Sequence, residues 1–388
     1  MRSGLKKRGM FLALLLVLAL VAAACSDDGG EETTTTAAAG GEETTTTAAG
    51  GEETTTTEAP AEETTTTVAA GGGEGVLVGM AYDIGGRGDK SFNDSAAAGL
   101  DRAVADFGIE ARELEPSAGG ENREENLRLL AESGHELTFA VGFAFGDAVT
   151  AAAVDFPDTN FAIIDSVVDA PNVVSLVFAE EQGSALVGAA AALKTQTNKI
   201  GFIGGVAGLG LIEKFEAGFA FGAAQVNPDV EIIVQYLTEF PDFAGFTDPA
   251  KGKEAALAMY QDGADIVYHA AGGSGAGLFE AAKETSESSG TKVWAIGVDS
   301  DQYLTAGDEV SEFILTSMLK RVDVAVYSTI AKYIEGGQQS NVVVLDLGAD
   351  GVAYSTTGGF VDDIAGQLDE LRLKIVSGEL EVPIEPAG

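Results

Sequence analysis

The sequence predicts an α/β protein made of two doubly wound parallel-sheet lobes with one cleft between them. Short β-rich runs alternate with helical patterns from residue 76 to the end, and most of these runs are apolar almost throughout. Such strands are typical of parallel sheets covered by helices on both faces. Eleven expected strands are too many for one small sheet, and the polar joint at 195–198 precedes a fresh strand. We therefore expect two lobes dividing near residue 198, with ligand loops at the strands' carboxyl ends.

The expected elements follow one another along the chain. The strands are 76–83, 109–115, 137–143, 161–165, 173–178, 200–204, 231–237, 265–269, 293–299, 312–317 and 342–347. The helices are 95–107, 122–133, 183–194, 211–225, 250–262, 276–286 and 322–335, with a further amphipathic helix at 362–377 whose lobe the sequence does not assign. The helices are amphipathic or rich in alanine, which is what a layer covering a sheet requires.

The composition excludes several function classes. The 388-residue chain carries 22 Lys and Arg against 61 Asp and Glu, a formal charge of −39. Nucleic acid binding needs basic residues to neutralise phosphates, so this charge argues against it. One cysteine excludes internal disulfides and cysteine-built zinc sites, and two histidines leave little room for a histidine-based metal centre. We expect no metal site and no cofactor.

The N-terminus resembles a bacterial lipoprotein export signal at residues 1–25. A basic segment precedes an apolar run at 11–21, which is too short for a membrane span of about 20 residues. Ala22 to Ala24 then lead to Cys25, as in a lipobox, although leucine is common where Ala22 stands. The alternative is an ordinary secretory signal with an incidental cysteine. The lipobox predicts that Cys25 is a lipid anchor, which holds the protein on the cell membrane and facing outside the cytoplasm.

Residues 26–75 are predicted to be a disordered linker. They contain four near-copies of a unit such as GGEETTTTAA and no aromatic residue. A segment of this kind cannot bury enough apolar surface to offset its ordering entropy. We expect it to act as a tether that makes no stable contact with the globular body.

Three glycine-rich segments follow expected strands. The loop 84–93 opens onto a helix but lacks the Gly-Lys-Ser/Thr ending of a P-loop. The segment 205–210 looks like a dinucleotide fingerprint with irregular spacing, and 272–277 misses a nucleophile elbow because residue 276 is Ala. Tight turning at strand ends is the ordinary role of such glycines, whereas ligand binding is the alternative.

A carboxylate and an amine stand at the ends of later strands. Asp299 closes the strand 293–299 and is followed by Ser300 and Gln302, a set that can bind sugar hydroxyls. Lys320 follows the strand 312–317 in an apolar context. The ordinary alternatives are N-capping for Asp299 and a solvated charge for Lys320.

Nine motifs cover nearly all of residues 76–330. They are GDKSFND (88–94), VGFAF (141–145), FAIID (161–165), EEQGSALVGAAA (180–191), IGFIGG (200–205), DPAKGKEAALAMYQDGADIV (248–267), AAGGSGAGLFEAA (270–282), WAIGVDSDQ (294–302) and LTSMLKRVDVAVY (315–327). In this order they resemble the basic membrane protein (BMP) family of substrate-binding lipoproteins of ABC transporters, specifically its purine nucleoside receptors.

The resemblance implies a type I periplasmic-binding-protein fold whose two lobes share a three-stranded hinge. On this basis lobe one comprises 76–197 plus 320–343, lobe two comprises 198–319 plus 344–388, and the helix 322–335 packs on lobe one. It also implies a non-enzymatic monomer that captures a nucleoside, expected to be a purine nucleoside, for the permease and ATPase subunits of an ABC importer.

The resemblance further implies two aromatic side chains that sandwich the base. Phe92 matches the first of them, in the loop D-x-S-F-N. Phe246 is the nearest match to the second, and Phe243 is its rival because this sequence carries extra residues at 240–243.

The polar roles carry over in the same way. Asp83 would hydrogen-bond the base edge with support from Asn93, and Gly273 would let the backbone approach the ligand. Asp299 and Lys320 would hold the ribose hydroxyls.

Other functions remain open from the residues alone. The same fold could bind another small ligand as a transport receptor or as a sensor. An exported α/β enzyme, such as a nucleoside hydrolase or a dinucleotide-dependent oxidoreductase, lacks support because no Ser-His-Asp order and no complete fingerprint is present. A surface adhesion protein would explain the tether but not the cleft.

Overall fold

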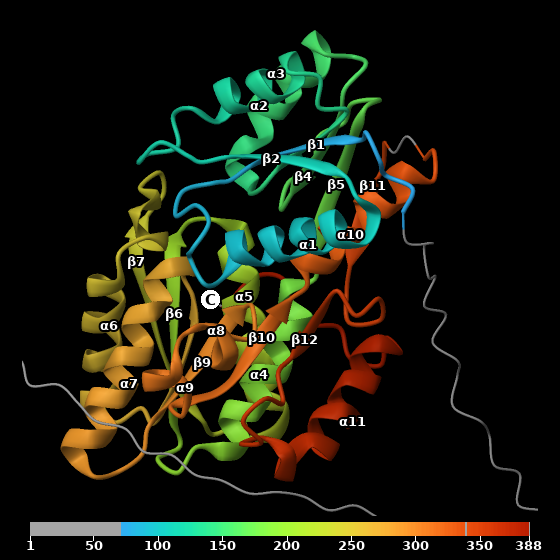
Figure 1. The fold of residues 1–388 in the computed structure, drawn as a ribbon. Coiled ribbons are helices and arrows are strands. Elements are labelled where there is room, and N and C mark those ends of the chain that lie inside the picture. The colour runs from blue at the N-terminus through green and yellow to red at the C-terminus, as the bar shows by residue number, and fades with distance from the viewer. Residues whose placement is uncertain (1–70, 338–339, 388) are drawn as a thin grey trace, which may run out of the picture. The chain divides into compact units, whose positions relative to one another are not determined.

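Two six-stranded sheets, each with helices on both faces, make up the described part of the chain, residues 71–337 and 340–387 of this computed structural model (Figure 1). The predicted signal, Cys25 and residues 26–70 of the predicted linker lie outside the described residues. The α/β fold of two parallel-sheet lobes is confirmed.

The first sheet belongs to lobe one and has the strand order β11-β5-β4-β3-β1-β2. All its pairs are parallel. Its strands are β1 (Leu77–Ala81), β2 (Glu110–Leu114), β3 (Leu137–Ala140), β4 (Asn160–Ile164), β5 (Val173–Phe178) and β11 (Val342–Leu345). Because β1, β3 and β4 are parallel neighbours, the loops after them meet at one edge of the sheet.

The second sheet belongs to lobe two and has the order β12-β10-β9-β8-β6-β7. Only the short edge strand β12 runs antiparallel, against β10. Its strands are β6 (Lys199–Ala207), β7 (Glu231–Glu239), β8 (Ile266–Ala270), β9 (Trp294–Asp299), β10 (Ile314–Lys320) and β12 (Val352–Tyr354). Strand β10 runs to residue 320, so Lys320 is the last residue of a strand and does not follow it.

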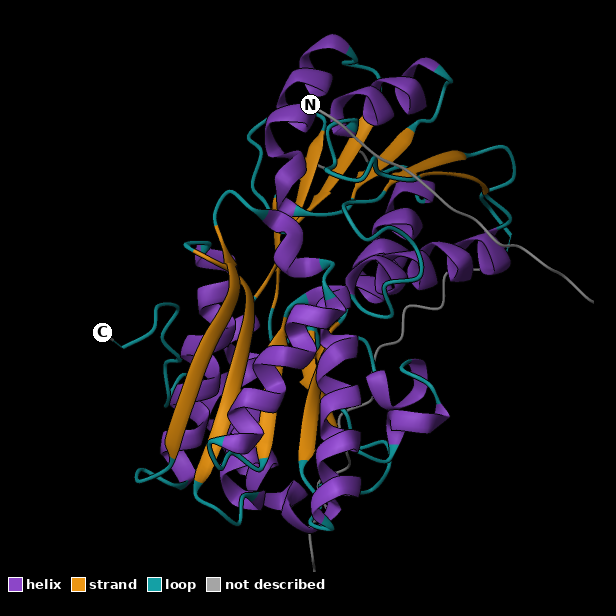
Figure 2. Ribbon diagram, turned by 90° about the vertical axis from the view of Figure 1, so that its left-hand side faces the viewer, coloured by secondary structure: helices purple, strands orange, loops and turns teal. Residues whose placement is uncertain are grey.

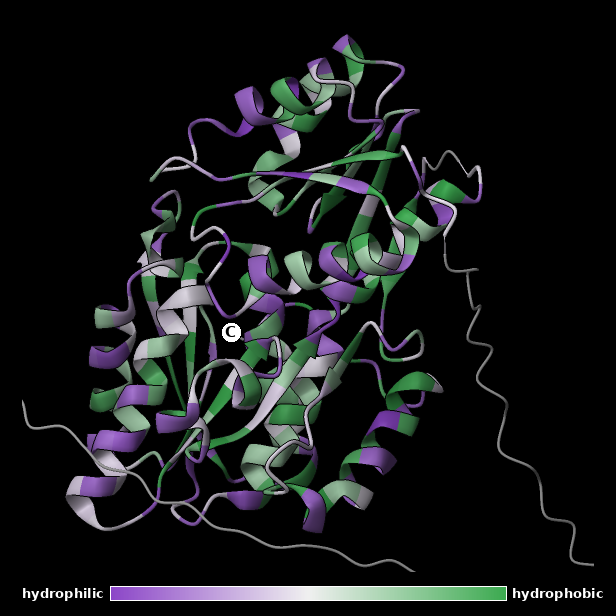
Figure 3. Ribbon diagram, in the orientation of Figure 1, coloured by the Kyte–Doolittle hydropathy of each residue, from purple (hydrophilic) through white to green (hydrophobic). Residues whose placement is uncertain are grey.

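Helices cover both faces of each sheet (Figure 2). Lobe one carries α1 (Phe92–Phe107) and α10 (Val322–Ile334) on one face and α2 (Arg123–Glu132) and α3 (Gly146–Asp155) on the other. Lobe two carries α4 (Glu180–Lys194), α5 (Gly210–Val226) and α11 (Ala365–Val376) on one face and α6 (Pro249–Gln261) and α7 (Gly275–Ser289) on the other. Most strands are hydrophobic along much of their length, whereas hydrophobic and hydrophilic residues alternate along the outer helices, as Figure 3 shows; β2, with the sequence EAREL, is an exception.

The chain passes between the lobes three times. It crosses at Ala179 between β5 and α4, at Arg321 between β10 and α10, and at 346–351 between β11 and β12. Helix α10 packs against α1, so it lies on lobe one as expected, and α11 packs on α4 in lobe two.

The predicted first crossing at residue 198 needs correction, because α4 packs against α5 and β10 of lobe two. Glycines on both helices explain this contact. A Cβ atom at Gly188 would overlap the backbone of Phe219, and one at Gly222 would overlap the backbone of Ala185. The two helices therefore approach each other backbone to backbone, and the crossing comes before α4.

The predicted linker also ends earlier than residue 75. The amide N–H groups of Gly71 and Gly73 donate to the carbonyl oxygens of Asp106 and Phe107 at the end of α1, both at 3.1 Å. These backbone bonds attach 71–75 to lobe one, contrary to the expectation of no stable contact. No helix within the described ranges is both long enough and apolar enough to span a membrane.

Candidate functional site

A cavity lies between the lobes, at the carboxyl ends of both sheets. Lobe one contributes the loops after β1, β3 and β4 and the start of α1. Lobe two contributes the loops after β7 and β8, the start of α5 and the last residues of β9 and β10. The cavity and its mouth together enclose about 680 Å³. The carboxyl ends of parallel strands are where α/β folds bind ligands, and here two such edges face each other.

All seven residues predicted as ligand contacts line this cavity. They are Asp83, Phe92, Asn93, Phe246, Gly273, Asp299 and Lys320. The structure therefore brings the predicted set together, and the binding role of each residue stays a prediction.

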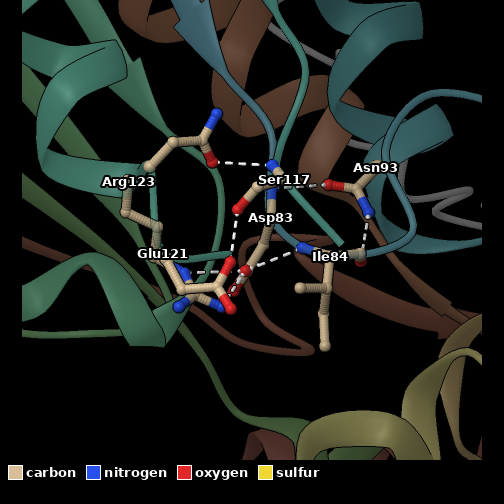
Figure 4. A network of polar contacts seen from close by, with 7 residues as sticks. Asp83, Ile84, Asn93, Ser117, Glu121 and Arg123 are labelled. Carbon is tan, nitrogen blue, oxygen red and sulfur yellow. Dashed lines mark hydrogen bonds and ion pairs between the residues drawn. The ribbon is translucent and has the colours of Figure 1, made fainter. Parts of the chain in front are cut away.

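Asp83 belongs to a polar network at the rim of lobe one (Figure 4). The guanidinium of Arg123 pairs with its carboxylate, with Nε 2.8 Å from Oδ1. The N–H of Ile84 donates to the same oxygen at 2.7 Å, and the side-chain oxygen of Asn93 accepts from the Asp83 N–H at 3.3 Å. Burial raises the pKa of Asp83 while Arg123 opposes that rise. The network holds this acceptor in a fixed direction at the cavity wall.

The network continues away from the cavity into the start of α2. Ser117 donates its hydroxyl to Glu121 at 2.6 Å, and its N–H donates to Asn122 at 2.7 Å (Figure 4). Asn122 and Asn126 donate to the carbonyl oxygen of Glu115, at 3.2 and 3.0 Å. These bonds fix the loop before α2 and hence the position of Arg123.

Four phenylalanine side chains among the described residues line the cavity, Phe92 and Phe143 from lobe one and Phe215 and Phe246 from lobe two. Phe92 is the first residue of α1, and Phe246 ends the 3₁₀ turn Phe243–Phe246. Phe243 does not line the cavity. Its ring packs edge-on against Phe143 of lobe one, with centroids 5.7 Å apart. The geometry therefore favours Phe246 over Phe243 as the second stacking ring.

A glycine behind Phe246 sets where its ring lies. A Cβ atom at Gly205 of β6 would overlap the ring edge of Phe246. Gly205, the first glycine of the dinucleotide-like segment, thus lies within strand β6 and has a packing cause.

We expect Gly205→Ala to weaken ligand binding about fivefold or more, because the added methyl group displaces a stacking ring. Gly210→Ala is the matched control, since a Cβ atom at residue 210 would point into open space. Calorimetric titration of both variants measures the difference. Equal affinities in the two variants would mean that Phe246 does not contact the ligand.

Lys320 is buried and surrounded by acids and rings. Its Nζ lies 2.6 Å from Asp165 Oδ2 and 3.1 Å from Glu180 Oε1, and its side chain is 2% exposed. The ring centroids of Phe92 and Phe178 lie 5.2 and 5.0 Å from Nζ. The neighbouring carboxylates raise the pKa of Lys320 against the lowering effect of burial, so the amine stays charged. The solvated-charge alternative is therefore wrong.

Asp299 is the last residue of β9 and adopts φ +65°, in the left-handed region. Its Oδ2 accepts the hydroxyl of Ser91 at 2.6 Å, across the lobes. Burial raises the pKa of Asp299 to about 6, opposed first by Lys320 and then by the Ser91 bond. No helix-cap bond uses this carboxylate among the described contacts, which argues against the capping alternative.

The sequence reasoning missed Asp165 as a site residue. It follows β4 directly, has φ +67°, and lines the cavity. Its Oδ1 is buried and has no hydrogen-bond partner in the described part of the chain, whereas Oδ2 pairs with Lys320. The signal was present, because Asp165 ends an apolar strand just as Asp83 and Asp299 do.

Phenylalanines, aliphatic residues, glycines and carboxylates make up most of the cavity lining. Among the described residues that line it, none is Ser, Thr, Cys or His. His269 is buried beside it, bonded to Gln302 at 2.9 Å, and burial lowers its pKa to about 4. No group of three or more metal-ligating side chains occurs within the described ranges. The described residues that line the cavity offer four phenylalanine rings, several hydrogen-bond acceptors and one buried cation.

Comparisons with known proteins agree with this picture. A family model described as ABC transporter substrate-binding protein PnrA-like matches residues 76–385. The ABC transporter nucleoside-binding protein BmpA of Lactococcus lactis subsp. cremoris is 36% identical over 323 residues, covering 78% of this chain and 88% of the relative. An uncharacterized lipoprotein of Pyrococcus abyssi is 34% identical over 326 residues, covering 80% and 79%.

A solved structure extends the similarity to the fold. The ABC transporter system solute-binding protein from Aeropyrum pernix K1 superposes with a TM-score of 0.69 at 29% identity, covering 79% of this chain and 94% of that one.

Proposed function

This chain belongs to the PnrA-like (Bmp) family of ABC transporter substrate-binding proteins, and we propose that the ligand it captures outside the cytoplasm is a purine nucleoside. The observation that carries this proposal is the joint placement of Phe92 and Phe246 in one cavity with Asp299 and Lys320. Two rings from opposite lobes suit a flat base, and a carboxylate beside an amine suits paired hydroxyls.

The charge of the cavity supports a ligand without phosphate. Among the described residues that line it are four carboxylates, those of Asp83, Asp89, Asp165 and Asp299, and one cation, Lys320. A phosphate group would meet this excess of negative charge in a partly desolvated space. The related BmpA of L. lactis is named as a nucleoside-binding protein, which agrees with the same ligand class.

A thermal-shift screen tests the ligand class. A ligand that binds only the folded state raises the midpoint of unfolding. We expect purine nucleosides to raise it and nucleotides to have little effect. A screen in which no nucleoside shifts the midpoint would overturn the proposal.

Ligand affinity should depend on pH through Asp299. Since its pKa is about 6, protonation on going from about pH 7 to about pH 5 removes a charged acceptor and should lower affinity about tenfold. The stability of the free protein changes in the opposite sense. The folded state holds this proton more tightly than the unfolded chain, so Asp299 costs stability as the pH rises through about 6.

The variant Asp299→Asn separates this effect from other titrations. Asp165, whose pKa burial also raises to about 6, remains in that variant and leaves a residual slope. Calorimetric titration at several pH values should therefore show a flatter profile for Asp299→Asn. An unchanged profile would remove Asp299 from the explanation.

We also propose that Cys25 anchors the protein to the membrane, where permease and ATPase subunits receive the ligand. The lipobox-like sequence and the related lipoprotein of P. abyssi support this. Cys25→Ser should release the protein into the medium, whereas deleting residues 26–70 should leave ligand affinity unchanged. Fractionation and titration measure the two outcomes. Retention of Cys25→Ser on the membrane would contradict the anchor.

A further inference from the structure

The loop before α1 joins the two lobes through side-chain and backbone hydrogen bonds. The carbonyl oxygen of Lys90 accepts from Gln302 Nε2 at 3.0 Å and lies 3.3 Å from the Thr305 hydroxyl. The carbonyl oxygen of Ser91 accepts from the Ser300 hydroxyl at 2.9 Å, and Lys90 Nζ donates to the carbonyl of Ala306 at 3.0 Å. The loop therefore docks on the carboxyl end of β9 and on α8 (Gln302–Thr305).

Ser91 adds a bond of a different kind, to Asp299 itself. It stands at the N-cap position of α1, where a serine hydroxyl ordinarily accepts an N–H of the first helical turn. Here it makes no cap bond. The carboxylate of Asp89 takes that role instead, accepting from the N–H groups of Asn93 and Asp94 at 2.9 and 3.1 Å. The Ser91 hydroxyl instead donates to Asp299 Oδ2.

The backbone on both sides of this bond is unusual. Lys90 has φ +56° and Asp299 has φ +65°, both in the left-handed region that residues other than glycine rarely adopt. Ser91 is fully buried and Asp299 is 7% exposed. A charge-assisted hydrogen bond in such a place fixes the direction of the carboxylate strongly.

We propose that Ser91 of lobe one is a positioning residue for Asp299 of lobe two. Its hydroxyl orients the Asp299 carboxylate toward the ligand only when the two lobes are in contact. The inference rests on the proposed function, because it gives Asp299 a hydroxyl-bearing ligand. The Ser91 bond occupies Oδ2, and the other oxygen receives the ligand hydroxyl. Lobe closure and recognition of the hydroxyl are thereby coupled through one side chain.

Two serine variants test this coupling. Ser91→Ala removes an inter-lobe bond that reaches Asp299, whereas Ser300→Ala removes an inter-lobe bond to the Ser91 carbonyl and leaves the Asp299 carboxylate alone. Calorimetric titration with guanosine and 2′-deoxyguanosine should show a loss of guanosine affinity of about 5- to 30-fold for Ser91→Ala and less than about threefold for Ser300→Ala. Ser91→Ala should also discriminate less between the two ligands.

A pH profile supplies a readout that a loss of packing would not move. The Ser91 bond favours the ionised form of Asp299, so Ser91→Ala should raise the pH at which affinity falls. Lys320, Asp89 and Asp165 also act on this carboxylate and are the same in both variants. If Ser91→Ala does not fold, Ser91→Cys keeps a similar volume with a weak donor and takes its place.

The outcomes separate the two ideas. Equal losses in the two serine variants, with an unshifted pH midpoint, would overturn the positioning role while nucleoside binding by the wild type stands. A wild type that binds no nucleoside would overturn the proposed function and this inference together.

Discussion

Replacing Asp299 with alanine is expected to weaken nucleoside binding by about 2–4 kcal/mol, a factor of about 30 to 700 in affinity. The buried carboxylate stands beside Lys320 in the cavity and is the acceptor that we assign to the ribose hydroxyls. Its loss leaves those hydroxyls without a charged partner in a desolvated space. Calorimetric titration with guanosine and 2′-deoxyguanosine measures the effect, and the wild type should bind the deoxynucleoside more weakly.

Asp301→Ala is the matched control for this variant. Asp301 lies two residues later in the same motif, but its Oδ2 accepts the hydroxyls of Ser355 and Thr357, at 2.8 and 2.5 Å, and it does not line the cavity. We expect its loss to lower stability and to leave affinity nearly unchanged. Equal binding of the ribo and deoxy ligands by the wild type would show that Asp299 and Lys320 do not clamp the ribose.

Removing either stacking ring should have the second largest effect. Phe92→Ala and Phe246→Ala should each cost roughly 1–3 kcal/mol, a factor of about 5 to 150 in affinity, because each ring covers one face of the base. Phe243→Ala is the control, since that ring contacts Phe143 and does not line the cavity. A larger loss from Phe243→Ala than from Phe246→Ala would reverse the assignment.

The sequence could predict that the candidate site residues lie together, because most of the polar ones stand at the carboxyl ends of strands. Asp83, Asp299 and Lys320 stand at or just after the carboxyl ends of apolar strands, and in a parallel sheet those ends share an edge. Asp165 obeys the same rule, because it directly follows the apolar strand β4. The rule, applied to that strand, would have predicted it as well. Glu180, the other carboxylate paired with Lys320, could not be inferred, since it stands at the start of α4 and not at the end of a strand.

The crossing at Ala179 was misplaced for a different reason. Helix α4 is rich in small residues, and a pattern of this kind does not say which sheet the helix covers. Which sheet α4 covers depends on Gly218 and Gly222 of α5, because these glycines let the two helices come into backbone contact. Helix α3 was overlooked because its sequence GDAVTAAAVD has only two large apolar residues and a weak helical period.

Titration of the wild-type protein with guanosine, with guanine and with ribose tests the central claim most directly. The account predicts that guanosine binds at one site per chain, and that guanine and ribose each bind much more weakly, because each engages only the rings or only the Asp299–Lys320 pair. Failure of guanosine, inosine and adenosine alike to bind would contradict the assigned ligand class, and binding of guanine as tight as that of guanosine would contradict the ribose clamp.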